Sequence, residues 1–338
     1  MSELLLMWDV LLLGTPLAVV AWLLVVWRGE HAVDRVPVLC YHRLTSQADL
    51  DSGKIVDDEP VWTVLDTTFA AQLDYLKNNG FETLDLDEVL AIQRGERPAP
   101  AKGVVITFDD GYESVLRLGA PLLAARGQRA VVYALLEPDS YTNGQVAGID
   151  RICTPDEILA MQAHGLQIGS HSMTHAILTT LSADKLRWEV EASKAQLSAL
   201  CGREINHFCI PRGGVSRAVV DAVRDAGYLT CSGRAKGTAR LASDWLTLPR
   251  IAVERHHTPA AFGKLLQPRH SFVHKVLGDL RLIPTRLFGA TWGRKLRSLL
   301  YGPGLSWLFA PRNVKRLLVL GAVLYGVALV ELVARRLG

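Results

Sequence analysis

Two adjacent carboxylates stand where an apolar run of the sequence ends. Asp109 and Asp110 follow directly on Val104 to Phe108, so both emerge from a predicted buried strand into a loop. Like charges this close repel and raise one pKa, unless a cation takes one carboxylate and leaves the other as a base. The alternative is an ordinary turn, because Asp110 and Gly111 form a common turn dipeptide.

A pair of histidines could complete such a cation site. His171 and His175 are four residues apart after a short predicted strand, and residues four apart on a helical turn face the same way. A lone histidine is more often a satisfied polar residue than a ligand. Together with Asp110, the two histidines would supply three ligands to a divalent ion and leave open positions for water and substrate, as a catalytic metal site requires.

These residues also carry a family resemblance. The run Thr107 to Gly111, followed by His171-Ser172 and His175, resembles the NodB-type polysaccharide deacetylases, the carbohydrate esterases of family 4. The resemblance extends from Pro37 to Glu254, is nearest the poly-N-acetylglucosamine deacetylase branch, and implies a distorted (β/α) barrel. The ligands that it implies for zinc, or for a similar divalent ion, are Asp110, His171 and His175.

The activity implied by this resemblance is metal-dependent hydrolytic N-deacetylation of an amino sugar. The ion would polarise the acetamide carbonyl, while Asp109 acts as the base toward the attacking water. In the family, a backbone N–H of an Arg-x-Pro-Tyr-Gly motif holds the oxyanion, and Cys209 to Gly213 occupies the matching stretch. Cys209 stands where many relatives have the arginine that steadies the base, so only the backbone role of Arg212 carries over. The Arg212 side chain either replaces that arginine or faces an anionic part of the substrate.

The proton donor for the leaving amine is less well defined. The family often uses a late histidine, which favours His256 or His257 after a predicted strand, the alternative being a solvated pair in a loop. Trp245 forms either a pocket wall beside an orienting Asp244 or simply a helix start. His42, after the first predicted strand, either lines the pocket or makes a structural hydrogen bond.

Strand-like and helical runs alternate along the middle of the chain, which predicts an α/β domain with parallel strands. Polar residues gather where strands end, as in a barrel whose active site lies on the loops after the strands. The predicted strands are Val36–Cys40, Val104–Phe108, Ala130–Leu135, Gln167–Gly169, His207–Ile210 and Leu229–Cys231. The predicted helices are Phe69–Asn79, Val115–Ala125, Pro155–His164, Ala183–Cys201 and Arg217–Ala226.

Apolar runs near both ends predict membrane segments outside this domain. Leu4 to Trp27 is long enough to span a bilayer and lacks the features of a cleaved signal, which favours an uncleaved anchor. Leu317 to Ala334 predicts a second span or an interfacial helix. The expected order is an anchor at 1–30, the deacetylase-like domain at 36–269, a membrane-proximal region at 270–316 and a transmembrane or interfacial helix at 317–336.

Charge and cysteine content indicate which partners to expect and whether the thiols are reduced. The region 270–316 mixes basic residues with aromatic ones and leucines, a pattern that favours contact with anionic membrane lipid, the alternative being a solvated basic face. Nucleic acid is not expected as a partner, because 37 basic and 34 acidic residues give a net charge of only +3. The five cysteines are scattered without a CxxC pair, which favours reduced, buried thiols.

The side of the membrane on which the domain lies determines which substrates it can reach. Arg28 and Arg35 follow the first apolar run, and no basic residue precedes it, so the positive-inside tendency places the domain on the cytoplasmic face of a bacterial inner membrane. Many relatives act instead on exported polymer. A cytoplasmic face favours an undecaprenyl-linked saccharide over an N-acylated amino-sugar glycan outside the cell. Two other functions stay open, a catalytically idle glycan-binding membrane protein and a deformylase or O-acetyl esterase with the same site.

Overall fold

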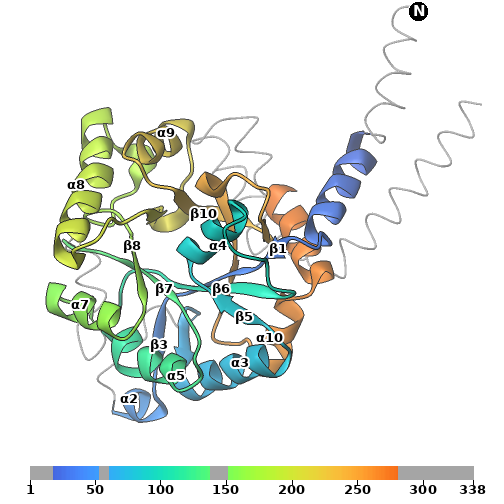
Figure 1. The fold of residues 1–338 in the computed structure, drawn as a ribbon, viewed down its shortest axis with the longest axis horizontal. Coiled ribbons are helices and arrows are strands. Elements are labelled where there is room, and N and C mark those ends of the chain that lie inside the picture. Colours follow the sequence, from blue (N-terminus) through green and yellow to red (C-terminus); the bar gives the residue numbers. More distant parts are fainter. Residues whose placement is uncertain (1–17, 53–60, 138–150, 281–338) are drawn as a thin grey trace, which may run out of the picture. The chain divides into compact units, whose positions relative to one another are not determined.

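An α/β barrel forms the centre of the computed structural model, which describes residues 18–52, 61–137 and 151–280 (Figure 1). The chain divides into two compact units, Met1–Phe272 and Val273–Gly338, and the barrel lies in the first. Its parallel sheet has eight strands, and all of them except β5 close into a ring because β2 also pairs with β6. In sheet order they are β2 (Val38–Tyr41), β12 (Leu248–Ala252), β10 (Thr230–Lys236), β9 (His207–Cys209), β8 (Gln167–Ser170), β7 (Val131–Ala134), β6 (Gly103–Phe108) and β5 (Glu82–Leu84). The predicted barrel is confirmed.

Helices connect the strands of the ring. They are α3 (Asp66–Asn78), α4 (Leu86–Gln93), the π-helix η1 (Val115–Gly119) with α5 (Ala120–Ala124), α7 (Pro155–Ala163), α8 (Ala183–Cys201), α9 (Arg217–Asp225) and α10 (Pro259–Leu265). The shorter elements are β1 (Arg35–Val36), β3 (Arg43–Thr45), α2 (Gln47–Asp51), β4 (Thr63–Leu65), η2 (Leu178–Thr180), η3 (Pro211–Gly213), β11 (Ala239–Arg240) and η4 (Trp245–Thr247). Every strand and helix that was predicted for the barrel domain has its counterpart here, whereas several elements, among them β5, α4 and α10, were not predicted.

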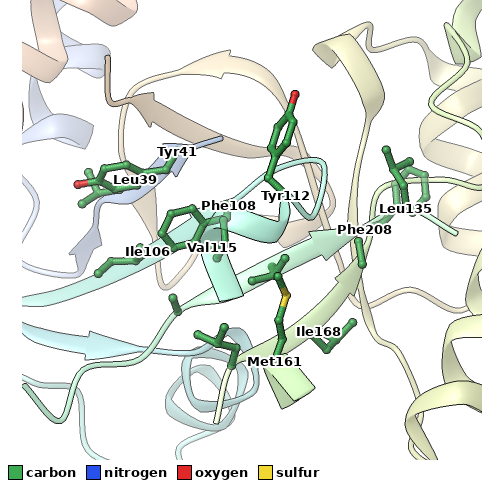
Figure 2. Close-up of a cluster of buried hydrophobic side chains, with 14 of the residues drawn as sticks. Leu39, Tyr41, Ile106, Phe108, Tyr112, Val115, Leu135, Met161, Ile168 and Phe208 are labelled. Carbon is green, nitrogen blue, oxygen red and sulfur yellow. The ribbon is translucent and has the colours of Figure 1, made fainter. Parts of the chain in front are cut away.

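Side chains of the ring strands alternate between two buried clusters, because successive residues of a strand face opposite sides. In β6, Ile106 and Phe108 belong to the outer cluster, which packs against the helices, and Val105 belongs to the inner one. Figure 2 shows part of the outer cluster, in which Val115 of η1 and Met161 of α7 lie against the strands. Burial of these side chains holds each helix on the ring.

Polar side chains occupy part of the ring's interior. The hydroxyls of Tyr133 on β7 and Ser232 on β10 lie 3.1 Å apart, and Arg250 on β12 donates to the hydroxyl of Thr107 on β6 at 3.3 Å. Neither pair of strands is adjacent in the sheet, so both hydrogen bonds cross the interior. Buried polar groups are stable only when they are paired in this way. Hydrogen bonds between non-adjacent strands therefore fix the interior of the ring, from which the loops after the strands extend.

The first described segment, residues 18–30, is helical and is joined to the barrel at its end. The buried carboxylate of Glu30 accepts hydrogen bonds from the backbone N–H and the hydroxyl of Thr238. Just beyond it, β1 pairs antiparallel with β11. Apolar side chains earlier in this helix are exposed, namely Val19, Val20, Leu24, Val25 and Trp27.

The predicted membrane segments fall largely on parts of the chain that the structure does not describe. Within residues 18–52, 61–137 and 151–280, no helix combines the length and apolarity needed to cross a bilayer. The predicted anchor at 1–30 lies partly, and the predicted helix at 317–336 wholly, outside these residues. Of the membrane-proximal region 270–316, only residues 270–280 are described, and they are helical.

Candidate active site

Chemically active side chains converge at the carboxyl ends of the ring strands. Asp109 and Asp110 follow β6, His171 follows β8, and His42 follows β2. In a parallel barrel these ends meet on one face, where side chains from different strands can be combined. The short, fully buried strands fix where each loop begins.

Asp110, His171 and His175 form a compact set of metal-ligand atoms. The Nε2 atoms of His171 and His175 lie 3.3 and 3.2 Å from the same carboxylate oxygen of Asp110. The Nδ1 atom of His171 is 2.8 Å from the carbonyl of Cys209, to which it can donate, leaving Nε2 as the ligand atom. Two imidazole nitrogens and one carboxylate oxygen are a donor set that suits zinc and similar divalent ions. The structure thus brings the three predicted ligands together.

The Asp110 carboxyl is an anion in this setting. Burial by itself raises its pKa, but hydrogen bonds from His171 and His175 outweigh that effect and hold the pKa well below its usual value. The pKa of His171 is raised, because the nearby carboxylates outweigh the opposing effect of burial. The ionised Asp110 carboxylate therefore places a negative charge among the ligand atoms, as a cation site requires.

Asp109 is held by an arginine that the sequence did not reveal. Arg250 of β12 donates from Nη1 to Oδ1 at 2.6 Å and from Nη2 to Oδ2 at 2.8 Å, and both side chains are almost fully buried. Burial raises the pKa of Asp109, but the charge and hydrogen bonds of Arg250 outweigh it and lower the pKa to about 2. The Arg212 side chain was one candidate for the role of the family's arginine, and the arginine that binds Asp109 is instead Arg250. A lone arginine within an apolar strand was the available signal.

Two thiols complete the surroundings of Asp109. Cys40 of β2 and Cys209 of β9 each lie 3.6 Å from its Oδ2 atom. Burial raises the pKa of both thiols, so both stay neutral and donate to the carboxylate. All five cysteines of the chain are free and buried, as predicted.

Left-handed backbone conformations are concentrated at this site. Among the described residues, the non-glycine residues with positive φ are Asp110 (71°), Ser172 (70°), His175 (67°) and Arg212 (55°). Such conformations cost energy and persist where the surroundings impose them. Gly111 has φ 73°, and a Cβ there would lie 3.2 Å from the Cα atom of Ala134. The loops after β6, β8 and β9 thus hold backbone conformations at the site that non-glycine residues disfavour.

His42 lies beside the base. One of its ring nitrogens, the Cys40 thiol and an Asp109 oxygen all lie within 4.8 Å of one another. The His42 ring packs on Trp62, with ring centroids 4.6 Å apart. Its buried Nδ1 atom has no hydrogen-bond partner among the described residues. His42 therefore lies beside the predicted base, and its place in a substrate pocket stays a prediction.

His256 and His257 lie on the loop after β12, with their rings 4.2 Å apart. His256 is exposed beside Glu254, while Nδ1 of His257 accepts from the backbone N–H of Glu254. Burial and the neighbouring His256 lower the pKa of His257 to about 4. A histidine that is neutral at pH 7 and engaged in its own loop is a poor proton donor. The geometry thus favours His42 over the predicted pair.

Two other predicted residues take different places. Trp245 is buried in the inner cluster and donates to the carbonyl of Arg240, and it lies just before β12 begins. It therefore sits at the opposite end of the ring from Asp109, so its predicted place in the pocket wall is corrected. The alternative prediction, a helix start, is confirmed, because Trp245 begins the short helix η4. Arg212 is exposed in the left-handed turn after β9, on the same face as the metal ligands.

Comparison with known proteins agrees with this geometry. Residues 96–231 match the polysaccharide deacetylase family. The match begins before β6 and ends within β10, so it covers part of the barrel. Members of this family are hydrolases that act on carbon–nitrogen bonds. The matched residues include Asp109, Asp110, His171 and His175, whereas Arg250 and His42 lie outside them.

Individual relatives and solved structures are also similar to this chain. The putative polysaccharide deacetylase YxkH of Bacillus subtilis is 24% identical over 241 residues, which are 71% of this chain and 79% of the relative. The poly-beta-1,6-N-acetyl-D-glucosamine N-deacetylase of Escherichia coli is 34% identical over 68 residues, 20% of this chain and 10% of the relative. The fold of the barrel is similar to that of the Streptococcus pyogenes deacetylase PplD, with a TM-score of 0.60 at 21% identity, over 70% of this chain and 100% of PplD.

Proposed function

We propose that this protein uses zinc, or a similar divalent metal ion, to remove an N-acetyl group from an amino sugar by hydrolysis. The observation that carries the proposal is the Asp110, His171 and His175 set beside a buried, ionised Asp109. Bound there, the ion would act as a Lewis acid toward the acetamide carbonyl and the attacking water.

The protein's own residues would perform the remaining steps. Asp109 is ionised at any physiological pH, and its Oδ1 atom keeps a lone pair beyond the one that Arg250 uses, so it can orient the water and take its proton. The backbone N–H of Arg212 would face the developing oxyanion. His42 would return a proton to the leaving amine, because it lies within reach of Asp109.

The assay for this activity is acetate release from N-acetylglucosamine oligomers by the purified full chain. We expect release to stop when a chelator removes the metal and to return when zinc is added. Hydrolysis that persists in metal-free protein would contradict the proposal. Parallel substrates with an N-formyl or an O-acetyl group test the deformylase and esterase alternatives.

The same assay distinguishes the candidate proton donors. We expect His42→Asn to lower kcat by about 10²-fold or more, the effect typical of a general acid. His257→Asn should change kcat little, because its Nδ1 atom is bonded within its own loop. If His257→Asn lowers kcat more than His42→Asn does, the proton donor lies on the loop after β12.

The substrate is proposed to be an N-acylated amino-sugar glycan or an undecaprenyl-linked saccharide. The name of the Escherichia coli relative supports a glycan of N-acetylglucosamine. Attachment to the inner membrane, with lipid as a partner, is proposed from the apolar run Leu4 to Trp27 and from the exposed apolar side chains of helix 18–30. We propose a cytoplasmic domain on the positive-inside tendency. A reporter inserted within the segment Ser46 to Glu59 tests that side, and a periplasmic signal there would overturn the proposal.

A further inference from the structure

A buried carboxylate of α8 binds the loop that carries both histidines. Oε2 of Glu189 accepts hydrogen bonds from the backbone N–H groups of Met173, at 2.9 Å, and Thr174, at 3.0 Å. Its Oε1 atom accepts from the hydroxyl of Thr174. The side chain is 3% exposed. Burying a carboxylate is unfavourable unless donors satisfy it, so these bonds have to form together.

The two residues that Glu189 binds, Met173 and Thr174, belong to the loop that carries the histidines of the metal site. Met173 and Thr174 lie between Ser172, with φ 70°, and His175, with φ 67°. Both flanking residues therefore hold a conformation that their side chains disfavour. Two further contacts close the loop, from the His175 backbone N–H to the Ser172 hydroxyl at 3.1 Å and from the Glu137 N–H to the Met173 carbonyl at 3.0 Å.

We propose that Glu189 is a positioning residue, which sets the separation and direction of His171 and His175 for the metal. The inference rests on the proposed metal site. Glu189 directs its oxygens to the loop backbone, so it acts on the ion only through the two histidines. Without it, the left-handed residues lose the contacts that impose their conformation, and the loop relaxes to spread the two imidazoles. Metal affinity then falls, because the apo loop has to be reordered when the ion binds.

The test is zinc titration of metal-stripped full-length protein, using competition with a chromophoric chelator. We expect Glu189→Ala to raise the Kd for zinc by about 10- to 100-fold, the range typical of groups that orient metal ligands. Glu189→Gln, which keeps the shape but loses the charge, should give a smaller increase. Glu191→Ala is the matched control, because Glu191 is exposed on the same helix, and its Kd should equal that of the wild type. At saturating zinc, kcat of both Glu189 variants should return close to the wild-type value.

A second measurement separates positioning from simple stabilisation. Thermal unfolding of each apo protein reports on the fold without the metal. If the apo Tm of the Glu189 variants falls while their Kd for zinc matches the wild type, Glu189 is only structural and the proposal is overturned. If Glu189→Ala does not fold, Glu189→Gln and Thr174→Val, which removes only the hydroxyl bond, decide the question by the same comparison. A wild-type protein that binds no zinc would instead overturn the metal site itself.

Discussion

Replacing Asp109 by asparagine is expected to lower kcat for acetate release by about 10²- to 10⁴-fold, the contribution typical of a general base. The amide cannot take a proton at neutral pH and cannot accept from Arg250 with both of its terminal atoms. Metal content should stay at the wild-type level, because Asp110, rather than Asp109, belongs to the set with both histidines. The measurement is kcat together with bound zinc per chain.

Asp225→Asn is the control for Asp109→Asn, because Asp225 is exposed at the end of α9 and the same change there should leave kcat unaltered. An Asp109→Asn protein that is folded, zinc-loaded and fully active would show that another group takes the proton. Loss of zinc together with loss of activity would instead mean that Asp109 contributes to metal binding.

Replacing Arg250 by methionine is expected to destabilise the domain by about 3–5 kcal/mol, the usual cost of leaving a buried charge without its partner. Asp109 would remain buried without its cation, so its pKa should rise from about 2 to above the ordinary value. Activity should fall at neutral pH, and its acid limb should move to higher pH. Chemical denaturation and a pH–rate profile measure these effects.

The pH dependence of the Arg250→Met deficit has a definite sign. In the wild type, the folded-state pKa of Asp109 is depressed, so the stabilisation from the pair is complete above the unfolded-state pKa of 3.8 and is lost as the pH falls toward about 2. In the variant, protonation relieves a buried, unpaired charge. The stability difference between the two proteins should therefore shrink between pH 7 and pH 4.

Arg240→Met provides the matched substitution for Arg250→Met. Arg240 forms an ion pair with Asp34 that is partly exposed, so its loss should cost under about 1 kcal/mol. If both arginine variants lose the same small amount of stability, the buried pair has no special role.

Spacing along the chain made part of the site predictable. Asp110 follows its strand directly, and His171 and His175 lie on one loop, so short-range pattern was enough to group them. The ring strands were predictable for a similar reason, since they are apolar runs bounded by polar residues. β5 escaped prediction because only Leu84 of its three residues, Glu82 to Leu84, is apolar.

Contacts between distant strands were not predictable. Arg250 meets Asp109 only because β12 lies beside β2, which in turn pairs with β6. No local signal fixes that order. The pocket-wall role predicted for Trp245 failed for a related reason. A residue just before a strand lies at the opposite end of the barrel from a residue just after it. A small shift in the expected strand start moves such a side chain from one end to the other.

The Asp109–Arg250 pair joins residues that are 141 positions apart in the chain. During synthesis, the base and all three proposed metal ligands leave the ribosome well before the arginine does. A nascent chain can therefore present the ligands while its base still lacks its counter-charge and the ring still lacks β12. Hydrolytic competence is thus tied to the last strand of the ring, and a chain cut short before Leu248 would retain the ligand residues without the completed site.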